Sequence, residues 1–152
     1  EVWPVLVPEL LGPAYRRHPR HLYAVLLIIG CLADWLRYHP DHLPAAIDYI
    51  VAGLGATADN GEVSIAAAAS TAIKYLCESC AVLLRPHLPA LCAVYREVRL
   101  RLPGRDQVSV AEGICHVLVE VSGSEASDEQ QQQQQVGTFE GLRAALPDAM
   151  AP

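Results

Sequence analysis

Three cysteines and one histidine have the residue types and spacing of a small zinc site. Cys77, Cys80, His87 and Cys92 read Cys-x2-Cys-x6-His-x4-Cys, and zinc binds four such ligands in a tetrahedron. Cys92, however, falls on the apolar face of a separate helical stretch, and an Arg-Pro pair places His87 at a turn. We therefore expect buried or half-buried structural thiols and no metal ion, and we keep a zinc-binding module as the weaker alternative.

The same Cys77 and Cys80 have the Cys-x-x-Cys spacing of a redox pair. Such a pair needs a helix N-terminus to lower the thiol pKa, whereas this one closes a helical stretch. An odd total of five cysteines, mainly within apolar patterns, fits reduced thiols of the nucleus or cytosol better than disulfides. No Ser/His/Asp order, phosphate-binding loop or HExxH motif occurs. We expect no catalytic residue, no cofactor and no enzyme activity.

The elements that carry these residues are organised by an internal repeat. His42-Leu43-Pro44-Ala45 recurs 45 positions later as His87-Leu88-Pro89-Ala90, each time after a long apolar stretch with helical spacing. A period of roughly 40 to 47 residues with two helices per unit is typical of HEAT-type solenoids, whose units must stack to bury their apolar faces. The sequence predicts an all-α superhelix of about three helical pairs and a leading helix.

Composition and charge exclude several classes of protein. The 152 residues are 52% hydrophobic, enough for an ordinary core. The formal charge of −6 opposes direct nucleic-acid binding and favours a basic or polar protein cargo. The longest charge-free apolar stretch, His21 to Ala33, is too short to span a membrane. The chain begins without Met or a signal peptide, so we interpret it as a fragment.

Apolar periodicity and Pro/Gly breaks divide the chain into outer, or A, helices and inner, or B, helices. We expect 1–20 to end a preceding repeat, and 21–56, 57–104 and 105–152 to be repeats, with a disordered Gln-rich loop over 122–137. The expected helices are short or bent pieces within Val2 to Arg17, then His21 to Tyr38, Leu43 to Gly55, Val63 to Leu84, Leu88 to Leu102, Ser109 to Val121, and Phe139 to Met150.

Two capping signals sharpen the expected helix starts. Asp41 is expected to cap the first B helix, where Pro44 in the first turn costs little because its missing N–H would have no helical partner. Ser109 and Glu112 have the spacing of a capping box at the start of the third A helix. The alanine run from Ala66 to Ala69 predicts a close approach between helices.

Polar residues on the two B helices are the candidate protein-binding surface. Tyr95, Arg96 and Arg99 lie in a mixed polar stripe with Glu97 and Arg101. Asp48 and Tyr49 occupy the comparable face of the first B helix. The simpler interpretation is a solvated face with a weak Glu97–Arg101 pair. Trp35 is expected to pack between repeats, with an exposed anchoring role as the less favoured alternative.

Two segments resemble a known family. Gly30 to Pro40 reads G-C-L-A-D-W-L-R-Y-H-P and Ala66 to Cys80 reads A-A-A-A-S-T-A-I-K-Y-L-C-E-S-C. Together they resemble the central HEAT repeats of the importin-beta superfamily, in the branch of transportin-SR and importin thirteen. The resemblance is strongest from about Ile28 to Val98, with Cys31 in the place of the family's Glu.

The resemblance implies a carrier that binds protein cargo, including basic or Arg/Ser-rich cargo, on its concave face. It further implies binding to the small GTPase Ran and to nucleoporins, shuttling between nucleus and cytoplasm, and no membrane or direct nucleic-acid partner. A HEAT-repeat scaffold or regulatory subunit of an enzyme complex, such as a phosphatase, is the alternative, because a fold alone does not fix a function.

Overall fold

The computed structural model is helical over the residues it describes, which are 3–12, 18–56 and 64–123. No strand occurs within these ranges, which confirms the predicted all-α class. The helices are α1 (Trp3–Leu10), α2 (Pro19–Cys31), α3 (Ala33–Arg37), α4 (Leu43–Gly55), α5 (Ile65–Ser79), α6 (Ala81–Leu84) and α7 (Leu88–Val98), the 3-10 helices η2 (Pro40–His42) and η3 (Arg85–His87), and a further helix over residues 104–123.

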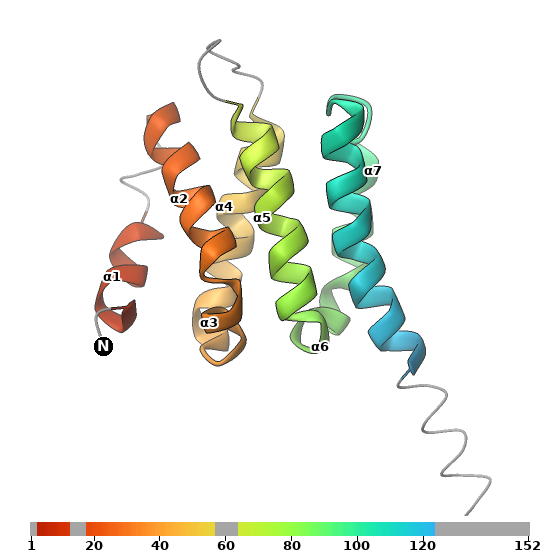
Figure 1. Ribbon diagram of the computed structural model, residues 1–152, viewed down its shortest axis with the longest axis horizontal. Helices are drawn as coiled ribbons and strands as arrows, with labels where there is room; N and C mark the ends of the chain where they lie inside the picture. The colour runs from red at the N-terminus through yellow and green to blue at the C-terminus, as the bar shows by residue number, and fades with distance from the viewer. Residues whose placement is uncertain (1–2, 13–17, 57–63, 124–152) are drawn as a thin grey trace, which may run out of the picture.

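The helices form two layers (Figure 1). The A helices α2 and α5 and the helix over 104–123 lie side by side in the front layer, and the B helices α4 and α7 lie behind them. α5 is the central element, since it packs against α2, α3 and α4. This arrangement confirms the predicted superhelix of helical pairs. The expected polar turn near 57–62, the Gln-rich segment from residue 124 onward and the last B helix fall outside the described residues.

The repeated His-Leu-Pro-Ala sequence has the same backbone conformation in both copies. His42 precedes α4 with φ −92° and ψ −9°, and His87 precedes α7 with φ −94° and ψ −2°. Each histidine is the last residue of a 3-10 helix, and the proline occupies the first turn of the α-helix that follows, where it breaks no helical hydrogen bond. The prediction that this motif marks the start of each B helix is confirmed.

Each of the first two A helices is split into a long and a short piece, where the sequence predicted one continuous helix. The first breaks at Leu32 (φ −92°, ψ 5°) and the second at Cys80 (φ −111°, ψ 22°). The backbone amides of Leu36 and Leu84 still bond the carbonyls of these two residues. Both leucines are buried, so the apolar periodicity continues across the break and periodicity alone does not reveal it.

Both predicted caps are wrong. Asp41 lies inside the 3-10 helix η2, and α4 begins after His42 with no side-chain cap. Helix 104–123 begins directly after Pro103, so Ser109 lies inside it and its hydroxyl donates to the carbonyl of Arg105. Glu112 instead pairs with Lys74 of α5. The capping-box spacing also occurs within helices, and here proline at the preceding position fixes the start.

The termini of the predicted stretches also differ in detail. Pro8 lies inside α1, and no break occurs there. Residues 122 and 123 belong to the helix over 104–123, so the predicted loop begins at least two residues too early. The hydroxyl of Ser122 donates a hydrogen bond to the carbonyl of Leu118, one turn earlier. A serine can make this bond within a helix, so its polarity does not by itself end the helix.

Helix contacts in the core depend on small residues. A methyl group built on Gly53 of α4 would lie 2.7 Å from Leu26 Cδ1 and 2.9 Å from Ala69 Cβ. One built on Gly113 would lie 3.0 Å from Lys74 Cα. Glycine thus lets α4 approach both A helices, and lets helix 104–123 approach α5. Ala69 is fully buried, in agreement with the close approach predicted from the alanine run.

No single helix in the described ranges is long and apolar enough to cross a membrane. The pair Ile65–Ser79 and Ala81–Val98 reaches the required length and composition only jointly, with a bend of 102° between its members.

Candidate protein-binding surface

The two candidate residues on α4 differ in their exposure to solvent. Asp48 is exposed. Tyr49 is fully buried, and its hydroxyl donates to the carbonyl of Gly12 over 2.6 Å. The prediction that Tyr49 lies on an accessible face is wrong, because this side chain fills the interior between α4 and the segment after α1. Of the two candidate residues on α4, Asp48 is the one that lies at the surface.

The candidate residues on α7 are accessible to different degrees. Tyr95 is half-buried and packs against the core cluster. Arg96 and Arg99 are exposed, and the Nε of Arg96 donates to the carbonyl of Cys92 at 3.4 Å. Exposed charged residues therefore lie within one helical turn, in sequence, of a partly covered aromatic residue, a combination suited to contact with another protein.

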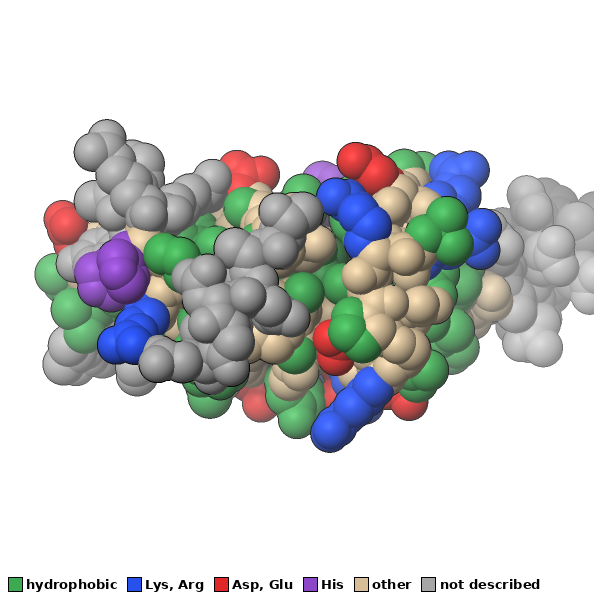
Figure 2. All heavy atoms as spheres, turned by 90° about the horizontal axis from the view of Figure 1, so that it is seen from above, with side chains coloured by type: hydrophobic (Ala, Val, Ile, Leu, Met, Phe, Trp, Pro, Cys, Tyr) green, Lys and Arg blue, Asp and Glu red, His purple; other side chains and the backbone are tan. Residues whose placement is uncertain are grey.

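These arginines continue around the turn that joins α7 to the next helix. We define the arginine corner as Arg96, Arg99, Leu100, Arg101 and Arg105, all of them exposed. Figure 2, which looks onto this end of the molecule, shows Lys and Arg side chains on its right-hand half with hydrophobic side chains between them. The polar stripe predicted from the sequence included Arg96, Arg99 and Arg101 but missed Leu100 and Arg105, although an arginine recurs at 96, 99, 101 and 105.

The turn that carries the arginine corner is held by backbone hydrogen bonds and two buried anchors. The amide of Arg99 bonds the carbonyl of Tyr95 (2.9 Å), and the amides of Arg101 and Leu102 bond the carbonyl of Val98 (2.9 and 3.2 Å). Val98 and Leu102 are 4% and 6% exposed. Because the anchors point inward, the residues between them are presented to solvent on a fixed backbone.

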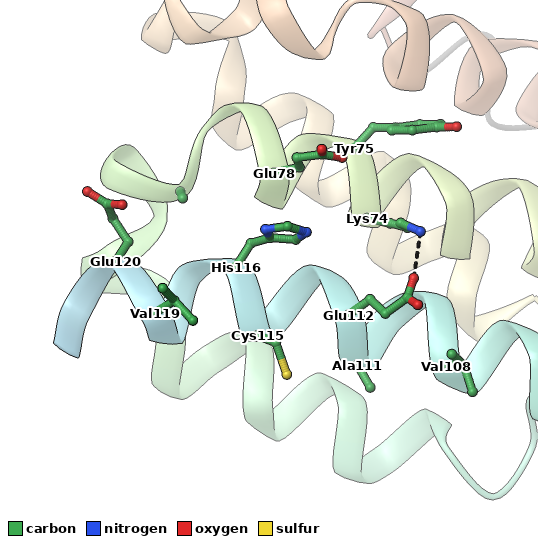
Figure 3. A pocket seen from close by; sticks show the side chains of 11 residues that line it. Lys74, Tyr75, Glu78, Val108, Ala111, Glu112, Cys115, His116, Val119 and Glu120 are labelled. Carbon is green, nitrogen blue, oxygen red and sulfur yellow. Dashed lines mark ion pairs between the residues drawn. The ribbon is translucent and has the colours of Figure 1, made fainter. Parts of the chain in front are cut away.

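A groove on the A-helix layer lies between α5 and helix 104–123. Its volume is about 850 Å³, and Figure 3 shows Lys74 of α5 reaching across to Glu112, with the Nζ–Oε2 distance 2.5 Å. The hydrogen bond to Glu112 raises the pKa of Lys74. The lining residues are Lys74, Tyr75, Glu78, Ala81, Val108, Ala111, Glu112, Cys115, His116, Val119 and Glu120.

A second groove lies between α2 and α5 and is more apolar. It holds about 500 Å³ and is lined by Leu26, Leu27, Gly30, Cys31, Ala68, Thr71, Ala72 and Tyr75. Tyr75, which is 47% exposed, borders both grooves. The A-helix layer thus carries two neighbouring depressions with one aromatic side chain between them, which sequence periodicity did not indicate.

Comparison with known proteins assigns the family. Residues 1–94 match the family model of the third TPR domain of Transportin-3/Importin-13. The chain belongs to this family. It is 32% identical over 96 residues to an uncharacterized protein, C11G11.07, of Schizosaccharomyces pombe. It is 26% identical over 97 residues to the mRNA transport regulator MTR10 of Saccharomyces cerevisiae.

Each of these alignments covers 63% of the chain but 10% of the relative, so this transportin/importin segment corresponds to about a tenth of the curated relatives' length. No solved structure matches it. The predicted membership of the importin-beta superfamily, in the branch of transportin-SR and importin thirteen, is confirmed.

Trp35 of this transportin/importin segment stacks on two histidines. Its ring centroid is 3.8 Å from that of His39 and 5.6 Å from that of His42, and a ring nitrogen of His39 lies 2.9 Å from the Trp35 carbonyl. The indole also packs partly against the core. Both stacking contacts lie at the corner between α3 and α4, within one repeat and not between repeats as predicted.

The cysteines of the segment separate into buried and exposed groups. Burial raises the pKa of Cys77 to about 12 and that of Cys80 to about 11, and the thiol of Cys80 donates to the carbonyl of Ala33 at 3.5 Å. Their predicted burial is confirmed. Cys31 and Cys115 are exposed. In the described part of the chain, no three His, Cys, Asp or Glu side chains gather closely enough for a metal ion.

We expect iodoacetamide to modify Cys31 and Cys115 of the folded protein and to spare Cys77 and Cys80, because alkylation requires an accessible thiolate. Mass spectrometry of digests taken at intervals measures this. Unfolding in guanidinium should expose all of these thiols, and rapid labelling of Cys80 without denaturant would contradict the buried site.

The raised thiol pKa values also predict how stability depends on pH. Both thiols have an ordinary pKa of 9.0, so above that pH the unfolded chain loses protons that the folded chain keeps. Their contribution is fully present below pH 9.0 and is lost as the pH rises through about 11 for Cys80 and about 12 for Cys77. Urea unfolding as a function of pH measures it. A Cys77→Ala/Cys80→Ala variant should show a weaker decline, and an unchanged decline would contradict the assignment.

Proposed function

We propose that this chain is a cargo-binding segment of a nuclear transport receptor, and that α4 and α7 supply the binding face. The observation that carries the proposal is the exposed charge on the B-helix layer, in a member of the Transportin-3/Importin-13 family. Asp48 on α4, Arg96 on α7 and Arg99 at its C-terminal cap are exposed, and the ring of Tyr95 on α7 is half-buried. Charged groups near a partly covered aromatic provide orientation and contact area for a protein ligand.

The mechanism is binding without chemistry. Each repeat contacts its neighbours alone, so small rotations between repeats add up along a solenoid and change the curvature of the concave face. Ran in its GTP form, bound to the same receptor, would favour one curvature and thereby release the cargo. The receptor would keep its cargo while Ran carries GDP and release it when Ran-GTP binds. This difference would give transport its direction.

Passage through the pore requires contacts on the other layer. The groove between α2 and α5, beside Tyr75, has the size and apolar lining to take aromatic side chains from nucleoporin repeats. This groove on the A-helix layer and the charges on the B-helix layer would let one segment hold cargo and contact the pore at the same time. The receptor would then shuttle between nucleus and cytoplasm.

A pull-down with the full-length protein as bait tests the function. Protein ligands captured from a nuclear and cytoplasmic extract should be released by Ran loaded with a non-hydrolysable GTP analogue and retained with Ran loaded with GDP. An Arg96→Glu/Arg99→Glu variant should lose at least part of the captured set, while Arg37→Glu, a matched charge reversal on α3, should not. Ligands that ignore the nucleotide would indicate instead a HEAT-repeat scaffold, the rival function.

A further inference from the structure

Positive charge is concentrated in one short stretch of an acidic chain. Residues 96–105 contain four Arg and one Glu, a net charge of +3, within a chain of formal charge −6. The next acidic residue, Asp106, is 9% exposed and lies in the first turn of helix 104–123. The arginine corner is therefore a local positive surface whose sign is opposite to that of the whole protein.

The arginine corner is also less compensated than other basic sites. Lys74 pairs with Glu112, and Arg85 with Glu120 at 2.9 Å, so each ties α5 or the turn after α6 to helix 104–123. Within the described residues, Arg99 and Arg105 have no carboxylate within 4.0 Å, and Arg101 reaches Glu97 only at 4.0 Å. These guanidinium groups stabilise no helix contact, which leaves them available for an external carboxylate.

An apolar side chain stands among these charges. Leu100 is 85% exposed, the highest value among the large exposed hydrophobic residues of the described chain. It lies between Arg99 and Arg101 on the turn whose buried anchors are Val98 and Leu102. A ligand with carboxylates alone would leave Leu100 in water, so the surface fits an acidic segment that also carries an apolar residue.

Arg101 lines one pocket together with Ala56 and Ser64, and the residues between Ala56 and Ser64 in the sequence include Asp59 and Glu62. For this reason we consider Arg96, Arg99 and Arg105, but not Arg101, as binding residues for an external ligand.

We propose that the arginine corner binds an extended acidic segment of a protein partner, with Asp or Glu side chains on Arg96, Arg99 and Arg105 and an apolar side chain on Leu100. This rests on the proposed function, because it gives the chemistry of one stretch of the cargo. Such a stretch complements a cargo that is basic elsewhere, since the rest of this chain carries a net negative charge. The carboxylates would set orientation and association rate, and the apolar contact would slow dissociation.

Fluorescence anisotropy with the full-length protein tests the proposal directly. The probe is a labelled peptide of Asp and Glu residues with one central Leu, and its matched control replaces every Asp and Glu by Asn and Gln. We expect the acidic peptide to bind and the neutral one not to bind. Arg99→Glu and Arg105→Glu should each weaken binding by about 3- to 10-fold, and Arg37→Glu should leave it unchanged.

Salt and the apolar contact supply two further measurements. Raising NaCl from about 50 to about 300 mM should reduce the effect of Arg99→Glu, since screening removes exposed charge interactions. Leu100→Ser should weaken the binding of the peptide that contains Leu. It should not change the binding of a variant peptide that has Ser in place of this Leu. Thermal unfolding of each variant, monitored by circular dichroism, confirms that the fold is intact before binding is compared.

Several outcomes would overturn the inference. The inference is wrong if the acidic peptide does not bind, or if Arg37→Glu and Arg99→Glu weaken its binding equally. It is also wrong if a single-stranded RNA oligonucleotide binds more tightly than the peptide and Arg99→Glu weakens the binding of that RNA. Failure of this inference differs from failure of the proposed function. A receptor that releases cargo with Ran-GTP but ignores Arg99→Glu disproves the acidic ligand alone, and one that binds the peptide but ignores Ran disproves the transport function.

Discussion

Replacing Gly53 with alanine is expected to lower the free energy of unfolding by about 1–3 kcal/mol, the usual cost of overpacking a filled interior. The new methyl group would lie 2.7 Å from Leu26 Cδ1 and 2.9 Å from Ala69 Cβ. Both partners are fully buried, and Ala69 has no rotamer with which to move away. Relief therefore requires a shift of α4 away from α2 and α5, which opens the interface between the first two repeats.

Gly55 provides the matched control for this substitution. It lies on the same helix two residues later, and a methyl group built there meets nothing within 4 Å. Gly55→Ala should be neutral or stabilising by up to about 1 kcal/mol, because alanine favours the helix more than glycine does. Urea unfolding of both variants measures the difference. Equal effects of the two substitutions would show that helix propensity, and not the close approach of helices, determines the result.

Some of the fold follows from the sequence because it depends on local chemistry. The position of proline in Leu43-Pro44 and Leu88-Pro89 permits only the first turn of a helix, so both B-helix starts are predictable from the repeat. The apolar period places Leu26, Ile73 and Leu76 in the core, and all three are buried. Such features depend on residues within about one turn of each other, which the sequence displays directly.

Other features depend on contacts between repeats and were not predictable. The break at Cys80 accompanies a bond from its thiol to Ala33, 47 residues earlier. Ser79 beside it donates to the carboxylate of Asp34 at 2.8 Å. Glu112 pairs with Lys74 of the preceding A helix and so takes no part in the capping box expected from its spacing. In each case a distant partner competes with the local preference, and the distant partner prevails.

The candidate site divides in the same way. The charged residues Asp48, Arg96 and Arg99 reach the surface as their polarity predicts. Tyr49 is predicted on that surface because it lies on the face of the first B helix comparable to that of the second. Its hydroxyl donates instead to the carbonyl of Gly12, and such a partner allows a tyrosine to be fully enclosed. The grooves beside Tyr75 arise from the spacing of whole helices, which no single stretch of sequence specifies.

Replacing Leu76 with alanine should have the largest effect on stability, a loss of about 2–5 kcal/mol. Leu76 is fully buried on α5, and α5 is the helix on which α2, α3 and α4 pack. The neighbouring Cys77 also faces Gly113 of helix 104–123, since a methyl group built on that glycine would lie 3.4 Å from Cys77 Cβ. A cavity at Leu76 therefore removes contacts next to two repeat interfaces at once.

Val82→Ala is the control for the substitution of Leu76, because Val82 is 54% exposed and truncation at the surface changes stability by about 0.5 kcal/mol or less. Hydrogen exchange separates a local from a shared effect. In a solenoid whose repeats are stabilised by their neighbours, Leu76→Ala should lower amide protection in α2 and in helix 104–123 as well as in α5. Loss of protection confined to α5 would show that the repeats unfold independently, and the transmission of small rotations along the chain would then lack its physical basis.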